Sequence, residues 1–131
     1  MDQQKLIELK ERMESRIKLR KYTPSEEMFL KRTIDFLTKE NGERKLVLFR
    51  SHSSDMAEYG ASIYEKGFVV VNEKDGYHIG LYESTETAED DGRVNKNIDE
   101  ASWGNDDTML DIMLSFRSMV EERLDEEEYD R

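Results

Sequence analysis

A run of polar side chains at Arg50, Ser51, His52, Ser53 and Ser54 has the residue types that bind a phosphate or carboxylate. It follows the apolar run 46–49, which is typical of a buried strand, and precedes Asp55, a residue type that begins helices. Anions bind at helix N-termini, and open α/β sheets place ligands at the carboxyl ends of strands. An ordinary capped turn is the preferred interpretation, because no glycine-rich cradle is present, and a ligand site at these residues is the alternative.

Serine, histidine and aspartate in this run do not predict a hydrolase triad. Working triads are assembled from separated segments, and the chain has no Gly-x-Ser-x-Gly motif. The two histidines, His52 and His78, lack the spacing to a second histidine or a carboxylate that sets a metal geometry. We therefore assign no catalytic residue, no metal ligand and no cofactor.

A second set of residues could bind a partner protein through carboxylates and one aromatic anchor. Its members are Glu86, Glu89, Asp90, Asp91, Trp103, Asp106 and Asp107. The alternative is a solubilising acidic surface, with Trp103 covering the core beside a helix start.

The charge of the chain is unevenly distributed. The net charge is −11 over 131 residues, yet residues 1–50 carry 13 Lys and Arg against 9 Asp and Glu, whereas residues 51–131 carry 7 against 22. An acidic body repels nucleic-acid phosphate and anionic lipid. The sequence therefore predicts a basic protein surface as partner, with no direct nucleic-acid or membrane contact.

The chain has no cysteine, no apolar run long enough to span a bilayer, and a charged N-terminus unlike a signal peptide. These features predict a cytoplasmic protein whose stability comes from packing alone.

Two helices are predicted before residue 43. Leu6, Leu9, Met13 and Ile17 form an apolar stripe on a helix from about 3 to 20. A second helix begins at the cap sequence 23–26 and ends at Asn41-Gly42, so residues 1–42 should form a helical hairpin.

Basic residues flank the apolar stripe of the first helix, at Lys5, Arg12, Arg16 and Arg20. Such a flank is a solvated face or a partner for the acidic half of the same molecule, with an anion contact as the alternative.

Residues 45–83 are predicted to form a β-α-β-β core. Strands at 46–49 and 68–73 flank a helix begun by Asp55-Met56, and Asp75-Gly76 makes a hairpin into an alternating strand at 77–83. The alternative is an antiparallel meander over 61–83, with a strand at 62–64 and a turn at 65–67.

Few apolar residues lie between 84 and 104, which predicts a mobile acidic loop. Residues 105–126 then predict a C-terminal helix with a wide apolar face, followed by a charged tail at 127–131. The expected fold is one α/β domain, or α+β, with a mixed sheet of about three strands and the C-terminal helix packed on it.

Two functions follow from these features. The first is a small acidic, non-enzymatic interaction module, such as a bacterial or phage inhibitor, an immunity protein or a nucleic-acid mimic, that docks on a basic partner. The alternative is a domain or enzyme that holds a phosphorylated, nucleotide-like ligand at 50–55. The apolar width of the C-terminal helix also allows a homodimer.

Overall fold

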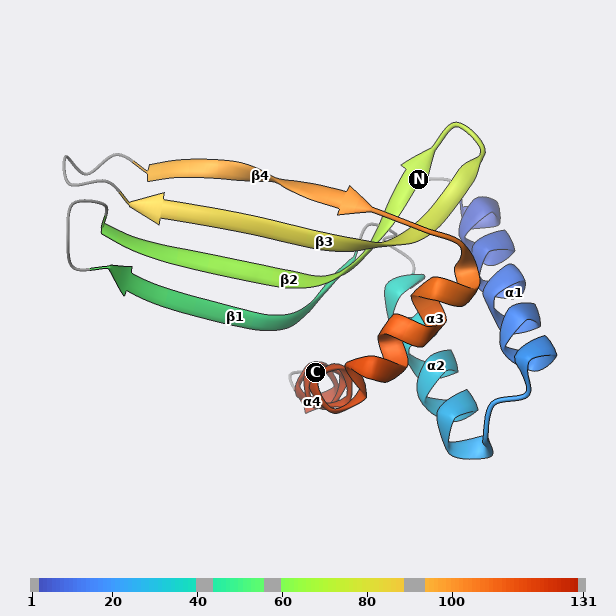
Figure 1. Cartoon of the computed structure of the whole chain (residues 1–131). Helices are drawn as coiled ribbons and strands as arrows, with labels where there is room; N and C mark the ends of the chain where they lie inside the picture. The colour runs from blue at the N-terminus through green and yellow to red at the C-terminus, as the bar shows by residue number, and fades with distance from the viewer. Residues whose placement is uncertain (1–2, 40–43, 56–59, 89–93, 130–131) are drawn as a thin grey trace.

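A computed structural model of the chain describes residues 3–39, 44–55, 60–88 and 94–129, with the backbone alone for 53–55, 60–61, 87–88, 94–100 and 129. The helices in these ranges are α1 (Gln3–Arg20), α2 (Pro24–Leu37), α3 (Asp106–Ser115) and α4 (Arg117–Tyr129). The strands are β1 (Lys45–Asp55), β2 (Gly60–Glu73), β3 (Gly76–Ala88) and β4 (Val94–Ser102). Figure 1 shows the helices gathered at one end of a long sheet. The predicted class, helices combined with one sheet, is confirmed.

The sheet is an antiparallel meander in the order β1-β2-β3-β4. The helix expected after Asp55, and the parallel pairing it implied, are wrong for the described residues, because Gly60–Glu73 is one unbroken strand. The alternative meander is right about the antiparallel pairing and wrong about a turn at 65–67. The hairpin at Asp75-Gly76 is confirmed, and Gly76 has φ +127°, which favours glycine.

The acidic loop expected at 84–104 is wrong as well. β3 continues to Ala88, and Val94–Ser102 pairs with it as β4. Residues 89–93 of the predicted loop lie outside the described residues.

The helical hairpin is confirmed, although its second helix ends at Leu37 and not at Asn41-Gly42 as predicted. Thr23 accepts from the Glu26 N–H at 3.2 Å, and the Glu26 carboxylate accepts from the Thr23 N–H at 2.9 Å, so both halves of the predicted cap are made. The expected C-terminal helix is instead two helices that meet at Phe116, with α4 seen end-on in Figure 1 where it turns away from α3. Asn105 caps α3 through the N–H of Thr108 at 2.8 Å.

The core lies between the helices and one face of the sheet. Residues opposite each other in an antiparallel pair share a face, so Phe68 and Leu81 lie beside Val70 and Ile79 on the helix side. From the helices, the largest fully buried side chains are those of Leu9, Met13, Ile17, Leu30, Ile34, Leu37, Leu110 and Met113. α1 and α3 contact β3, and α4 contacts β1, which confirms that the C-terminal helices pack on the sheet.

The sheet is longer than its helical cover. Figure 1 shows the four strands extending well past the helices toward the ends of β1 and β3. We call this extension, residues 50–55, 60–64, 83–88 and 94–101, the sheet arm. None of its described side chains is fully buried, which explains why its strands lack the apolar pattern of a core strand.

Gly67 lies close against the backbone of β1, at a bulge between Val47 and Phe49. A Cβ on Gly67 would lie 1.9 Å from the Leu46 carbonyl oxygen, whereas a Cβ on Gly104 would meet Thr108 at an ordinary 3.7 Å. We expect Gly67→Ala to lower the free energy of unfolding by about 1–3 kcal/mol or more, because backbone has to move. Urea denaturation measures this, with Gly104→Ala as the control; equal effects of the two substitutions would contradict the assignment.

Candidate functional site

The predicted ligand residues do not converge in the structure. Arg50 and His52 lie opposite Glu65 and Ile63 on one face of β1, whereas Ser51 lies opposite Tyr64 on the other. Ser53 and Ser54 continue the same strand, and only their backbone is described. The helix expected to supply N–H groups to an anion is a strand over its described residues. The geometry on which the ligand site rested is therefore absent.

Two of the predicted partner residues are engaged inside the molecule. Arg12 Nε donates to Asp106 at 2.8 Å, and Arg16 Nε donates to Asp107 at 2.9 Å. Arg20 forms an ion pair with Asp111 at 3.0 Å. Three arginines spaced four residues apart on α1 thus bind carboxylates in the first turns of α3. We call these three pairs the α1–α3 ladder. The expectation that this basic flank neutralises the chain's own acidic half is confirmed for these three arginines.

The remaining predicted partner residues are dispersed. Glu86 is half-buried on β3, on the sheet face away from the helices, and Glu89, Asp90 and Asp91 lie outside the described residues. The Trp103 ring stacks on the His78 ring with centroids 5.2 Å apart, and the His78 Nε2 lies 2.9 Å from Asp75. Trp103 keeps 37% of its surface exposed. It lies on the uncovered sheet face, outside the core that it was alternatively expected to cover.

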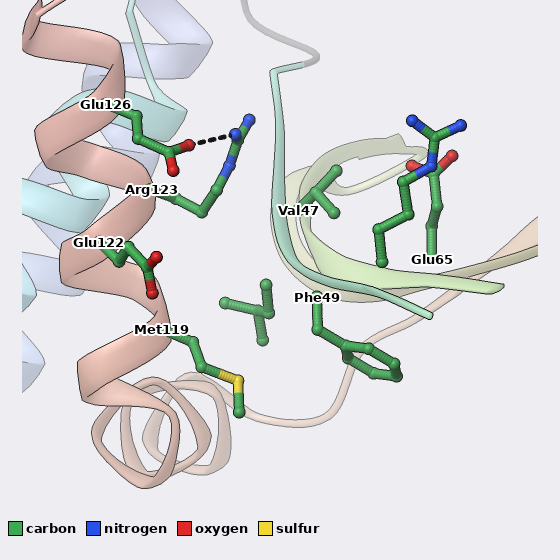
Figure 2. Close-up of a pocket in the computed structure, with 9 residues that line it drawn as sticks. Val47, Phe49, Glu65, Met119, Glu122, Arg123 and Glu126 are labelled. Atoms are coloured by element: carbon green, nitrogen blue, oxygen red, sulfur yellow. Dashed lines mark hydrogen bonds and ion pairs between the residues drawn. The ribbon is translucent and has the colours of Figure 1, made fainter. Parts of the chain in front are cut away.

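An open groove of about 300 Å³ lies between α4 and β1. We call it the α4–β1 groove; it is lined by Val47, Leu48, Phe49, Arg50 and Glu65 from the sheet and by Met119, Glu122, Arg123 and Glu126 from α4. Figure 2 shows Met119 and Glu122 projecting from the helix toward β1, with open space between the two elements. Arg123 pairs with Glu126 at 2.6 Å beside that space.

A second hollow, of about 350 Å³, adjoins the first on the sheet arm. We call it the arm hollow, and it shares Phe49 and Glu65 with the α4–β1 groove; its other lining residues are Ser51, Tyr64, Lys66, Glu83, Ser84 and Thr85. Three large apolar side chains on these hollows are unusually open: Phe49 is 42% exposed, Tyr64 43% and Met119 42%. Exposed aromatic and methionine side chains gathered at one place are typical of binding surfaces.

Two segments of the chain carry most of its net negative charge. α4 holds six carboxylates against two arginines, and residues 83–102 hold seven against one arginine and one lysine. Several are paired, as Asp125 and Glu128 with Arg32 of α2 at 2.7 and 2.8 Å and Glu83 with Lys66 at 3.2 Å. The carboxylates left over on α4 produce a negative field beside the α4–β1 groove, which attracts cations from a distance.

The described residues contain no group of three or more His, Asp or Glu side chains placed to hold a metal ion. No helix in the described part of the chain is long and apolar enough to cross a bilayer.

Comparison with protein-family models, curated proteins and solved structures finds no match to the chain.

Sequence reasoning missed the groove residues Met119, Glu122 and Glu126, although it identified the surplus apolar width of the last helix. The spacing of these three residues places them on one side of α4, and that pattern was available in the sequence. Their position opposite β1 was not available, because it depends on the turn at Phe116.

The α1–α3 ladder predicts an acid-sensitive contribution to stability. The hydrogen bond and charge of Arg16 hold the pKa of Asp107 below its ordinary value. A depressed pKa contributes stability above the unfolded value of about 4, and this is lost as the pH falls through the folded value. In Arg16→Gln, we expect the Asp107 pKa, followed by carboxyl NMR, to rise toward the ordinary value. Lys18→Gln, an equal charge change at an exposed position on α1, should leave it in place; a shift of the same size there would contradict the pairing.

Tyr22, at the same junction between α1 and α3, predicts a second contribution to stability, one that is lost at alkaline pH. Burial, followed by the hydrogen bond that its hydroxyl donates to Asp111 at 3.0 Å, raises the pKa of Tyr22 to about 12. The neutral phenol therefore contributes stability below the unfolded value of about 10, and the contribution is lost as the pH rises from there to the folded value. Ultraviolet titration should show a tyrosine ionising near pH 12 that disappears in Tyr22→Phe. A titration curve unchanged by this substitution would refute the assignment.

Proposed function

We propose that this chain is a non-enzymatic protein-interaction module that docks on a basic surface of a partner protein. The observation that carries the proposal is the gathering of Phe49, Tyr64 and Met119 around two adjoining hollows on acidic elements. Binding energy at interfaces concentrates in a few large apolar or aromatic side chains, and charge complementarity selects and steers the partner.

The internal ion pairs separate the carboxylates that hold the fold together from those that remain for a partner. The carboxylates of Asp106, Asp107 and Asp111 hold α3 to α1, so they are structural. α4 retains a surplus after intramolecular pairing, since its six carboxylates meet two arginines of α4 and Arg32 of α2, which pairs with Asp125 and Glu128. We therefore assign the docking surface to the α4–β1 groove and the arm hollow, and not to Asp106 and Asp107 of α3, which were first predicted to bind the partner.

An acidic module of this kind suits an inhibitor, an immunity protein or a nucleic-acid mimic of a bacterium or phage, acting in the cytoplasm on a basic target. A phosphorylated ligand at 50–55 is not favoured, because Arg50 and Ser51 lie on opposite faces of one strand. Thermal-shift screening against nucleotides and sugar phosphates separates the two functions: no shift is expected, and a clear rise in melting temperature would support the ligand site instead.

Two properties of the docking surface are tested, its negative charge and its apolar contact with the partner. A basic protein captured by the immobilised chain is purified and titrated against it in solution. We expect affinity to fall as salt rises, because ions screen the attraction. Met119→Asp should weaken binding by roughly tenfold or more, since it places a charge in the apolar contact, and Glu122→Lys should slow association.

Matched controls lie elsewhere on the helices. Met28→Asp changes a methionine that is 74% exposed on α2, and Glu11→Lys changes an exposed glutamate of α1. These variants should bind like the parent chain. Affinity that is indifferent to salt, or controls that weaken binding as much as the groove variants, would count against the proposal, and a dimer seen by light scattering that is lost in Met119→Asp would show that the surface serves a second copy instead.

A further inference from the structure

The α4–β1 groove runs along β1, an outer strand of the sheet. Four consecutive residues of the strand line it, Val47, Leu48, Phe49 and Arg50. The bulge between Val47 and Phe49 interrupts the alternation of side chains, so residues on either side of it border the same hollow. No described strand pairs with the outer edge of β1, because β1 is the first strand in the sheet order. Its outward N–H and C=O groups are therefore available to a further strand.

The opposite wall is one side of a helix. Met119, Glu122, Arg123 and Glu126 are spaced at i, i+3, i+4 and i+7 on α4, which places them in a single row. Figure 2 shows this row facing β1 across the open groove. A groove between the free edge of a strand and one side of a helix has the form that accepts an extended peptide segment.

A bulge in β1 sets where such a segment can begin to pair. Regular pairing with β2 is interrupted between Val47 and Phe49 and resumes at Phe49, from which it continues to Asp55. Leu48, 6% exposed, lies at the interruption and forms the floor of the groove. An added strand therefore pairs from Phe49 onward, along Arg50, Ser51 and His52.

We propose that the docking surface binds its partner by strand addition: an extended segment of the partner pairs with the edge of β1 from Phe49 to His52. This inference rests on the proposed function and specifies how the partner is held. The backbone of the segment makes the ladder hydrogen bonds, and its side chains toward α4 meet Met119, Glu122 and Glu126. These neighbours select apolar and basic side chains at alternate positions of the segment.

The negative surplus of α4 supports a basic segment over an acidic one. The groove itself is nearly balanced, with Glu65, Glu122 and Glu126 against Arg50 and Arg123. Arg123 is already paired with Glu126 and, at 3.5 Å, with Glu127. A cationic segment thus meets Glu122 at close range and the other α4 carboxylates at longer range.

The test uses the whole chain and a synthetic array of eight-residue peptides. Thr occupies every second position of each peptide, and all combinations of Lys, Glu, Val and Ser occupy the positions between. We expect the chain to select peptides rich in Lys and Val. The strongest binder is then compared with two copies N-methylated at alternate residues, one copy for each of the two alternate sets, so that every side chain is kept. One of the two copies should bind about tenfold more weakly or worse, because the alternate N–H groups that face β1 make the ladder hydrogen bonds.

Two further measurements locate the bound peptide. Amide hydrogen exchange should slow at alternate residues between Phe49 and His52, since only every second N–H of an edge strand points outward. Met119→Asp and Glu122→Lys should weaken binding of the peptide, whereas Met28→Asp and Glu11→Lys should leave its binding unchanged. Both groove substitutions lie on the exposed side of a helix, so circular dichroism and melting temperature verify that each variant folds.

The outcomes separate this inference from the proposed function. If a basic protein binds with salt sensitivity but N-methylation has no effect, or if exchange slows elsewhere than β1, strand addition is wrong and the docking function stands. An array without preference for Lys over Glu, or without any binder, also overturns strand addition. If neither basic proteins nor peptides bind, both proposals fail together.

Discussion

The structure depends on burying one face of the sheet at one end only. Phe68, Val70 and Ile79 meet the apolar sides of the helices there, and hydrophobic burial of this kind is the dominant favourable term in folding. The helices are too few to cover strands of this length, as Figure 1 shows. The same constraint that stabilises the body therefore leaves the projecting sheet arm without helical cover.

The arginines of α1 fix the position of α3 relative to α1. Apolar packing is non-directional, whereas the guanidinium groups of Arg12 and Arg16 each form two hydrogen bonds with one carboxylate of α3. Arg12 also donates to the Tyr77 carbonyl oxygen at 3.1 Å, so one side chain joins a helix, a second helix and the sheet. Exposed ion pairs add little to stability, but three in register specify how far α3 lies along α1.

Where the sequence carries strong local signals, the fold could be predicted. The cap at Thr23, the stripe on α1 and the turn before Gly76 each have one physical interpretation, and each is confirmed. The error after Asp55 arose because Met56, Gly60, Ile63 and Gly67 follow helical spacing, while the arm part of β2 lies beyond the helices and carries no apolar alternation. β4 was missed because its residues are mostly polar and resemble a loop. The groove could not be predicted, because it joins segments about 70 positions apart whose contact depends on the kink at Phe116.

The stacking of Trp103 on His78 has a practical consequence. This is the chain's single tryptophan, and it lies where β4 passes into α3, the junction between the sheet and its helical cover. Its intrinsic fluorescence is therefore a label-free reporter of the moment at which the helices separate from the strands. Fluorescence and far-ultraviolet circular dichroism that change together during unfolding would show one cooperative unit, and a fluorescence change that comes first would reveal a partly opened intermediate.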